Sequence, residues 1–216
     1  MAELNIVFED ADILLVDKPA GLATQTSKIA EKDLVSVVKN YQKGGYIALI
    51  NRLDQNVEGL VLFAKTKEGA SNLSAQLQNN TIKKIYKAKV YGSLEESASL
   101  EDYLVKDSVL NKAKVVDKST NMAKKAKLKY TVDRKVDTSF GTYSEVTIRL
   151  ETGRFHQIRV QFSSRGNPIL GDVKYGNDIS KKLSQELRCN TIALRACSLE
   201  FRHPRDNRLC KYEIEK

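Results

Sequence analysis

Polar residues next to apolar segments are where this sequence could place chemistry. Asp54 stands beside Arg52, between the apolar residues 48–50 and the apolar run 59–64. A carboxylate between two buried strands costs free energy unless a cation or several donors compensate its charge. Asp54 is therefore a candidate functional residue. Taken alone, the simpler interpretation is an aspartate that caps the following turn.

A second polar set occupies residues 152–159, at the expected start of a helix. It brings Arg154, His156, Gln157 and Arg159 onto the first turns, and an exposed basic helix start is the simpler alternative. The sequence has no G-x-x-x-x-G-K-[ST], G-x-G-x-x-G, G-x-S-x-G or H-E-x-x-H motif, so nucleotide, serine-hydrolase and zinc-protease chemistry are not indicated. We expect no metal and no cofactor.

Length and composition indicate one soluble globular domain over residues 1–216. Hydrophobic residues make up 41% and charged residues 29% of the chain, which is ordinary for a folded domain. No apolar run approaches the ~20 residues that span a bilayer, and the acidic start Met1-Ala2-Glu3 does not resemble a signal peptide. Three cysteines without a C-x-x-C pair favour reduced thiols over a disulfide framework. We expect a cytoplasmic protein without a membrane partner, and a monomer.

The charge balance points to a polyanionic partner. The chain has 36 Lys and Arg against 27 Asp and Glu, a formal net charge of +9. Many of the lysines cluster within residues 83–89 and 112–129. Neutralising phosphates releases counterions, so such clusters suit nucleic acid. The alternative is a lysine-rich surface that serves solubility.

Hydrophobic periodicity predicts strands and helices in alternating groups. Strands are expected at 6–8, 13–16, 59–64, 86–91, 128–132, 146–150, 194–201 and 209–214, and helices at 34–41, 70–77 and 155–165. Because the strands come mostly in adjacent runs, the prediction is an α+β fold with a mixed, largely antiparallel sheet flanked by helices. Residues 106–127 are expected to be the least ordered part on composition.

Six segments together resemble the RNA pseudouridine synthases, specifically the RluA-type family. They occur in the family's order and run through nearly the whole chain: Lys18-Pro19-Ala20-Gly21, Asn51-Arg52-Leu53-Asp54 with residues 59–66, residues 84–92, Thr152-Gly153-Arg154-Phe155-His156-Gln157-Ile158-Arg159-Val160, Pro168-Ile169-Leu170-Gly171-Asp172 with Tyr175-Gly176, and Leu194-Arg195-Ala196 with Phe201-Arg202-His203-Pro204. One such match would be weak, whereas six in order are a strong signal.

The resemblance implies an isomerase that needs no cofactor, with a central RNA-binding cleft. In the reaction of that family the uracil base of a uridine is detached from C1′, turned and rejoined through C5. Asp54 matches the catalytic aspartate, and Arg159 matches the arginine that pairs with it and keeps it ionised. Tyr86 matches the tyrosine that stacks on the base and could move a proton. Arg52 matches the arginine that fills the gap left by the extruded base.

Further residues are expected to bind the RNA substrate. These are Asn51, Arg154, His156, Gln157, Leu194, Lys83 and Lys84. Lys83 and Lys84 are expected to precede a strand, which leaves them free to reach phosphates. The family's separate S4 module has no counterpart before about Ile6, so the catalytic body itself is expected to hold the RNA. The chain departs from the family pattern at Asn51, usually His, and at Val57-Glu58, usually Thr-Ser.

Two alternatives to an active enzyme remain open, and the departures at Asn51 and Glu58 favour the first of them. One is a catalytically impaired RNA-binding protein or RNA chaperone with the same fold, and the other is a basic protein bound to ribosomal RNA. The presence of Asp54, Tyr86 and Arg159 argues for the enzyme, which is expected to act on tRNA or rRNA. RNA that carries 5-fluorouridine distinguishes an active enzyme from both alternatives, because only an enzyme is expected to form a stable complex or a rearranged product with it.

Overall fold

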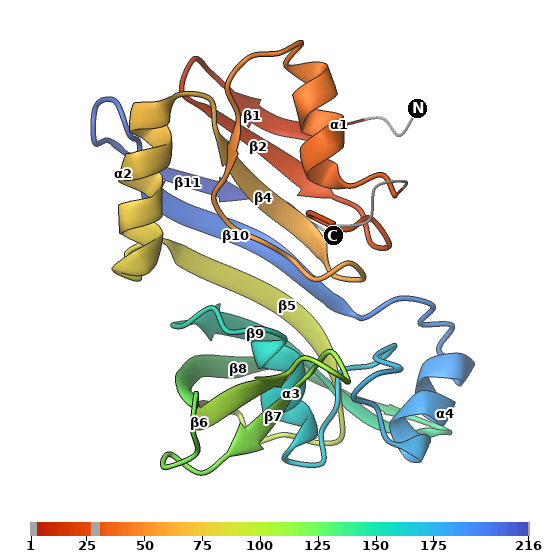
Figure 1. Ribbon diagram of the computed structural model, residues 1–216. Coiled ribbons are helices and arrows are strands. Elements are labelled where there is room, and N and C mark those ends of the chain that lie inside the picture. The colour runs from red at the N-terminus through yellow and green to blue at the C-terminus, as the bar shows by residue number, and fades with distance from the viewer. Residues whose placement is uncertain (1–3, 27–30, 216) are drawn as a thin grey trace. The chain divides into compact units, whose positions relative to one another are not determined.

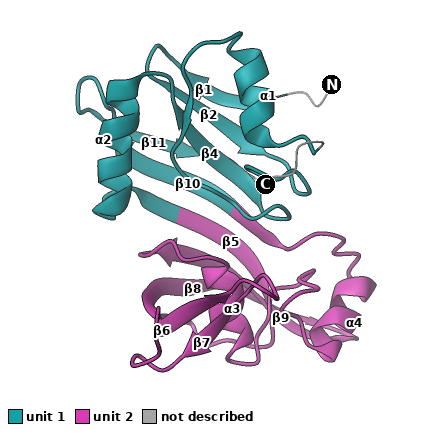
Figure 2. Ribbon diagram, viewed as in Figure 1, with its two compact units in different colours: residues 1–84, 196–216 teal, residues 85–195 magenta. Residues whose placement is uncertain are grey.

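The computed structural model describes residues 4–26 and 31–215, and the chain divides into two compact units (Figures 1 and 2). Unit 1 comprises the chain up to Lys84 and again from Ala196 onward, and unit 2 comprises Ile85 to Arg195. Both units contain helices and mostly antiparallel strands, which confirms the predicted α+β class.

Unit 1 is built on a sheet with the strand order β1-β2-β4-β10, in which β11 pairs with β10 and β3 with β4. The strands are β1 (Ile6–Glu9), β2 (Ile13–Lys18), β3 (Ala48–Leu49), β4 (Glu58–Ala64), β10 (Leu194–Arg202) and β11 (Leu209–Glu213). All four residues from Ile13 to Val16 are fully buried. Since successive side chains point to opposite faces, both faces of β2 are covered.

Two helices of unit 1 begin at capping residues that the sequence supplies. In α1 (Leu34–Tyr41) the Asp33 carboxylate accepts from the Ser36 amide, while the Ser36 hydroxyl accepts from the Asp33 amide. This reciprocal pair satisfies two backbone donors that the first turn leaves open. Thr66 caps α2 (Lys67–Gln78), whose Leu73 packs into the core with residues of β2, β4 and β10. Helix α2 is therefore packed against the sheet of unit 1, the unit whose loop carries Asp54.

Unit 2 contains two helices and strands that pair in the order β5-β9-β8-β6-β7, where β5 belongs to it from Ile85 onward. Its elements are β5 (Lys83–Tyr91), β6 (Ser97–Asp107), β7 (Lys112–Val116), β8 (Lys124–Thr138), β9 (Gly141–Leu150), α3 (Gln157–Ser163) and α4 (Asp178–Glu186). Val160 of α3 packs on Leu104, Ala113 and Ala126. The helix is thereby held against β6, β7 and β8, with every residue from Gln157 to Phe162 buried.

The structure corrects the expectation of weak order in residues 106–127. That segment completes β6, forms β7 and begins β8. Two of its exposed lysines make ion pairs with neighbouring strands, Lys125 with Glu101 and Lys114 with Asp107. The composition suggested disorder because the buried side chains that hold these strands are partly small, such as Ala113 and Ala126.

The structure also corrects two element boundaries near the candidate site. The helix expected over 155–165 is α3, which begins only at Gln157 because His156 has a left-handed backbone with φ 52°. Lys83 and Lys84 do not precede a strand but are the first residues of β5. Lys84 shares the buried face of Tyr86, whereas Lys83 is exposed.

Candidate active site

Asp54 lies in a loop of unit 1 that is fixed on both sides of it. On one side, the Leu53 amide donates to the Thr24 hydroxyl, which itself donates to the Leu53 carbonyl at 2.7 Å. On the other side, the Gly21 amide donates to the Gln55 carbonyl at 2.9 Å. Leu53 is buried, while Asp54 is only half-buried. The loop therefore holds the carboxylate at a fixed backbone position and leaves part of it accessible.

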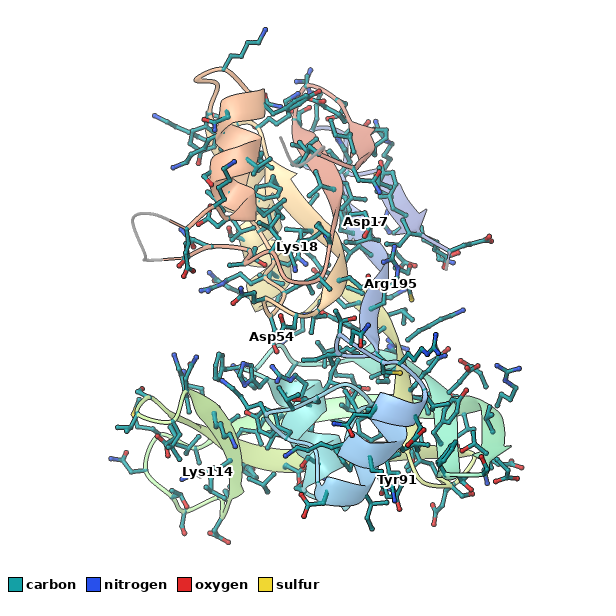
Figure 3. The ribbon with its side chains drawn as sticks, turned by 90° about the vertical axis from the view of Figure 1, so that its right-hand side faces the viewer. Asp17, Lys18, Asp54, Tyr91, Lys114 and Arg195 are labelled. Carbon is teal, nitrogen blue, oxygen red and sulfur yellow. The ribbon has the colours of Figure 1, made fainter. Side chains whose placement is uncertain are left out.

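The fully buried ammonium of Lys18 bonds several backbone carbonyls of this region. Figure 3 labels Lys18 and Asp54. The Lys18 Nζ donates to the carbonyls of Pro19, Leu22 and Gln55 at 2.8, 2.8 and 3.0 Å. A protonated amine has three N–H donors, so three carbonyls use all of them. One ammonium thus connects the end of β2 to the residue that follows Asp54.

The electrostatic surroundings of Lys18 join it to the candidate nucleophile. Burial lowers the pKa of Lys18 to about 8, while the carboxylates of Asp54, Glu58 and Asp17 act to raise it. Glu58, one of the departures from the family pattern, is the first residue of β4 and is half-buried. Its charge therefore supports the protonated state of Lys18, which bridges the Asp54 loop.

A close approach of two strands explains the glycine that follows this loop. Gly59 has φ 119°, and a Cβ built on it would lie 2.2 Å from the Ala196 carbonyl oxygen of β10. Only glycine adopts this backbone at low cost, and only glycine leaves room for Ala196. Gly59 therefore has a steric role in the candidate site and no chemical one.

The two neighbours of Leu53 face different surroundings. Arg52 is exposed, which suits contact with a macromolecule. Asn51 is buried: its Oδ1 accepts from the Leu62 amide at 2.7 Å and its Nδ2 donates to the Leu60 carbonyl at 3.2 Å. The Asn51 amide thus bonds the backbone of β4, and its expected contact with RNA stays a prediction.

In unit 2, the residues around the start of α3 have very different degrees of exposure. Arg154 is exposed and donates from Nε to the Lys125 carbonyl at 2.9 Å. Gln157 is buried; its Oε1 accepts from the Thr152 hydroxyl and the Arg154 amide, and its Nε2 donates to the Lys127 carbonyl and Gln161. Gln157 therefore connects the turn before α3 to β8.

His156 and Arg159 are held by residues from the segment after α3. The Nδ1 atom of His156 lies 2.8 Å from the Tyr175 hydroxyl. Arg159 makes a buried two-bond ion pair with Asp172. Neither Asp172 nor Tyr175 was expected to have a role, although both stand in the matched segment 168–176. That match was the only signal in the sequence that could have found them.

Four candidate residues lie on β5 and β10, the strands at which the chain passes from one unit to the other. Tyr86 of β5 and Leu194 of β10 are in unit 2, whereas Lys83 and Lys84 of β5 are in unit 1. Tyr86 and Leu194 are 7% and 4% exposed. Lys83 pairs with Glu200, and burial lowers the pKa of Lys84. The predicted ion pair joins Asp54 of unit 1 with Arg159 of unit 2, and it stays a prediction.

One group in the described part of the chain has ligand atoms close enough to hold a metal, namely Asp10, Asp12 and His203. Both carboxylate oxygens of Asp12 accept from Arg205, at 2.6 and 3.0 Å. Asp10 accepts from two backbone amides and bonds His203. The donor set is thus engaged with cations and amides, which fits an ion-pair cluster better than a metal site. Among the described helices, none is long and apolar enough to cross a membrane.

The comparison with protein families decides between the readings of the sequence. Residues 12–164 match the family described as RNA pseudouridylate synthase. The chain belongs to this family. It is thus an RNA pseudouridine synthase, an isomerase, which confirms the prediction and disfavours the alternative of a binding protein without catalysis.

Named relatives support the same assignment. Ribosomal large subunit pseudouridine synthase D of Pseudomonas aeruginosa is 35% identical to the synthase, over 98% of this chain and 68% of the relative. The dual-specificity RNA pseudouridine synthase RluA of Vibrio parahaemolyticus is 33% identical, over 94% of this chain and 79% of the relative. The tRNA pseudouridine synthase C of Haemophilus ducreyi is 30% identical, over 94% and 87%.

Solved structures agree with the fold of the synthase. The structure of human RNA pseudouridylate synthase domain containing 1 superposes with a TM-score of 0.81 at 21% identity and covers 99% of this chain and 84% of that one. A second human structure, RNA pseudouridylate synthase domain containing 4, has a TM-score of 0.76 at 20% identity, over 98% and 88%. Both confirm the predicted pseudouridine synthase fold.

Proposed function

We propose that this synthase isomerises a uridine of tRNA or ribosomal RNA, with Asp54 as the nucleophile. The relatives carry names of both substrate classes. In the reaction the C1′–N1 bond breaks, the base turns and a C5–C1′ bond forms, while the proton on C5 is lost and N1 gains one. The atoms balance without an oxidant or a reductant, so no cofactor is needed.

The observation that carries this assignment is the anchoring of the Asp54 loop. Its backbone is held at Leu53 by Thr24 and at Gln55 by Gly21 and Lys18. A nucleophile must be held close to its attack geometry, because misplacement of about 1 Å can cost ~100-fold in rate. Half-burial leaves the carboxylate able to meet a substrate.

The remaining residues receive roles from their chemistry and exposure. Tyr86 stacks on the base and moves a proton, and Arg159 keeps the nucleophile ionised. Arg52, which is exposed, occupies the space of the extruded base. Leu194 provides an apolar wall. The further substrate contacts are assigned to Asn51, Arg154, His156, Gln157, Lys83 and Lys84.

The proposal extends to the organisation of the protein. Residues 1–216 act as one catalytic domain, the protein works as a monomer in the cytoplasm, and RNA is its macromolecular partner. The net charge of +9 supports an RNA substrate held through phosphate contacts.

The test is a map of pseudouridine in total RNA from cells with and without this gene. We expect at least one site to lose its modification and to regain it with the wild-type gene but not with Asp54→Asn. RNA that carries 5-fluorouridine should form a stable complex or a rearranged product with the wild type. An unchanged map together with no reaction on this RNA would refute the proposed function.

A further inference from the structure

The segment Pro168–Gly176 holds two side chains that the proposed reaction does not use. Asp172 is 2% exposed and follows Gly171, where the backbone has φ 77°. A Cβ on Gly171 would lie 1.9 Å from the Thr191 carbonyl oxygen. The chain can therefore make this turn only with glycine, and the turn delivers Asp172 to the buried side of α3.

The Asp172 carboxylate holds Arg159 by two hydrogen bonds. Arg159 Nε donates to Oδ2 at 2.7 Å and Nη2 donates to Oδ1 at 2.9 Å. The same Oδ1 accepts from the amides of Lys174 and Tyr175 at 3.0 and 3.1 Å. The carboxylate is thus fixed by its own backbone before it fixes the guanidinium. Paired arginine–carboxylate bonds set orientation as well as distance.

Tyr175 contacts both Arg159 and His156. The guanidinium carbon of Arg159 lies 5.0 Å from the centre of the Tyr175 ring. The Tyr175 hydroxyl accepts from the Ala113 amide at 2.6 Å and lies 2.8 Å from His156 Nδ1. A tyrosine hydroxyl can both donate and accept, so it bonds Nδ1 in either neutral tautomer of the imidazole. Tyr175 thereby holds the orientation of the His156 ring.

His156 has an unusual backbone conformation for a residue with a side chain. Its φ of 52° is a conformation that residues other than glycine seldom adopt, and it directs the imidazole toward Tyr175. Phe155 stacks on the same ring at 3.7 Å between centroids. A strained residue that is over-determined by its surroundings is characteristic of a functional position.

We propose that Asp172 and Tyr175 are positioning residues, which hold the Arg159 guanidinium and the His156 imidazole in their working orientations before RNA binds. The inference rests on the proposed function, in which Arg159 and His156 serve the reaction. Asp172 takes two of the five N–H groups of the guanidinium and balances its charge. Arg159 can therefore stay buried and oriented in the RNA-free enzyme without depending on the nucleophile for its counter-charge.

The matched control is a second arginine–aspartate pair, which lies just beyond the C-terminal end of α3. Asp102 of β6 accepts two bonds from Arg165, which follows α3, at 2.8 and 3.1 Å. Asp102→Asn breaks a pair of similar geometry that also ties the α3 region to the sheet. Asp102 also accepts from Gln161 Nε2 at 2.7 Å, so the substitution alters the bonds to Arg165 and Gln161 and leaves the contacts of Asp172 and Tyr175 with Arg159 and His156 in place.

The experiment follows pseudouridine formation under enzyme excess, over times that detect rates 10⁴-fold below wild type. Asp172→Asn should lower the maximal rate by about 10- to 100-fold, while the enzyme concentration that gives half of this rate stays within threefold of wild type. Asp102→Asn should keep the rate within threefold, even where its melting temperature falls as far as that of Asp172→Asn. In an Arg159→Ala background, Asp172→Asn should have no further effect beyond threefold, because its action passes through Arg159.

If the rate losses from Asp172→Asn and Arg159→Ala multiply in the double variant, Asp172 has a general structural role and the proposal is overturned. A rate of Asp172→Asn alone that stays within threefold of wild type also overturns it. If Asp172→Asn does not fold, Tyr175→Phe decides: the enzyme concentration that gives half of the maximal rate should rise at least threefold, and an unchanged value overturns the proposal. A wild type that forms no pseudouridine refutes the proposed function itself, whereas an active wild type with unaffected variants refutes only this inference.

Discussion

Replacing Lys18 by methionine tests the anchoring of the Asp54 loop. The change keeps much of the buried side chain's volume and removes the ammonium that bonds Pro19, Leu22 and Gln55. Two effects oppose each other. A pKa of about 8 instead of 10.5 means that the buried charge costs about 3 kcal/mol, and methionine removes that cost. Three carbonyls then lose their donor, at about 1–3 kcal/mol each.

The balance is a loss of about 0 to 6 kcal/mol in the free energy of unfolding, with a central value of about 3 kcal/mol. Natural domains have about 5–15 kcal/mol, so at the central value Lys18→Met should fold at room temperature. Turnover should fall at least tenfold, because the backbone next to Asp54 loses its connection to the end of β2. Urea unfolding and a pseudouridine assay on the same preparation measure the two effects.

The pH dependence provides a sharper test of the same reasoning. The pKa of Lys18 is lower in the folded protein, so between about pH 8 and 10.5 the unfolded chain binds more protons. The free energy of unfolding therefore gains about 3 kcal/mol from this group as the pH rises through that window. Turnover should move the other way and fall above about pH 8, since a neutral amine has two N–H donors for three carbonyls.

Lys65→Met is the matched control for this prediction. Lys65 follows the other end of β4 and bonds the Glu9 carboxylate and the Asp10 carbonyl. Its loss should lower stability and leave turnover and its alkaline fall unchanged. If Lys18→Met kept the wild-type turnover, or the wild-type pH profiles of stability and turnover, the argument for Lys18 would be refuted.

Two further predictions concern the nucleophile and the phosphate contacts. Asp54→Asn should abolish isomerisation while RNA affinity stays within about tenfold, or ~1.4 kcal/mol, because it keeps the shape and removes the charge; near-normal turnover would remove Asp54 from the site. Alanine at both Lys83 and Lys84 should weaken RNA binding more than alanine at both Lys87 and Lys89, since Lys84 lies on the same face of β5 as the tyrosine proposed to stack on the base. Removing one phosphate-binding lysine should reduce the magnitude of the slope of log affinity against log salt by about 0.7 to 0.9. If the two double variants weakened binding equally, or in the reverse order, the RNA would be placed on the face of β5 that carries Lys87 and Lys89.

Local patterns in the sequence predicted much of the fold. The helix Leu34–Tyr41 has the expected limits, because an apolar period of a helix ends near Gly44. The strands Ile13–Lys18 and Glu58–Ala64 were visible as short apolar runs. The pairing of β6 with β7 was not visible, since its exposed lysines hide the few buried residues between them.

The candidate residues were predicted from motifs, but the bonds that hold them were not. Lys18 reaches Gln55 across 37 positions of sequence, and Asp172 reaches Arg159 across a turn that depends on Gly171. Such contacts exist only after the loops fold, so residue types alone could not reveal them. The sequence did indicate Arg159, yet it suggested Asp54 as its carboxylate and gave no reason to choose Asp172.

The division into units has a consequence for how the protein is made. Unit 2 is one continuous stretch of chain, whereas unit 1 is interrupted by it (Figure 2). The core of unit 1 includes Leu199, Phe201 and Cys210, which leave the ribosome after all of unit 2. During synthesis, unit 2 can thus close its core first, while β1, β2 and β4 wait with apolar surface uncovered until β10 and β11 arrive. The N-terminal part of unit 1, up to Lys84, therefore keeps apolar surface exposed to water for longer during synthesis than unit 2 does.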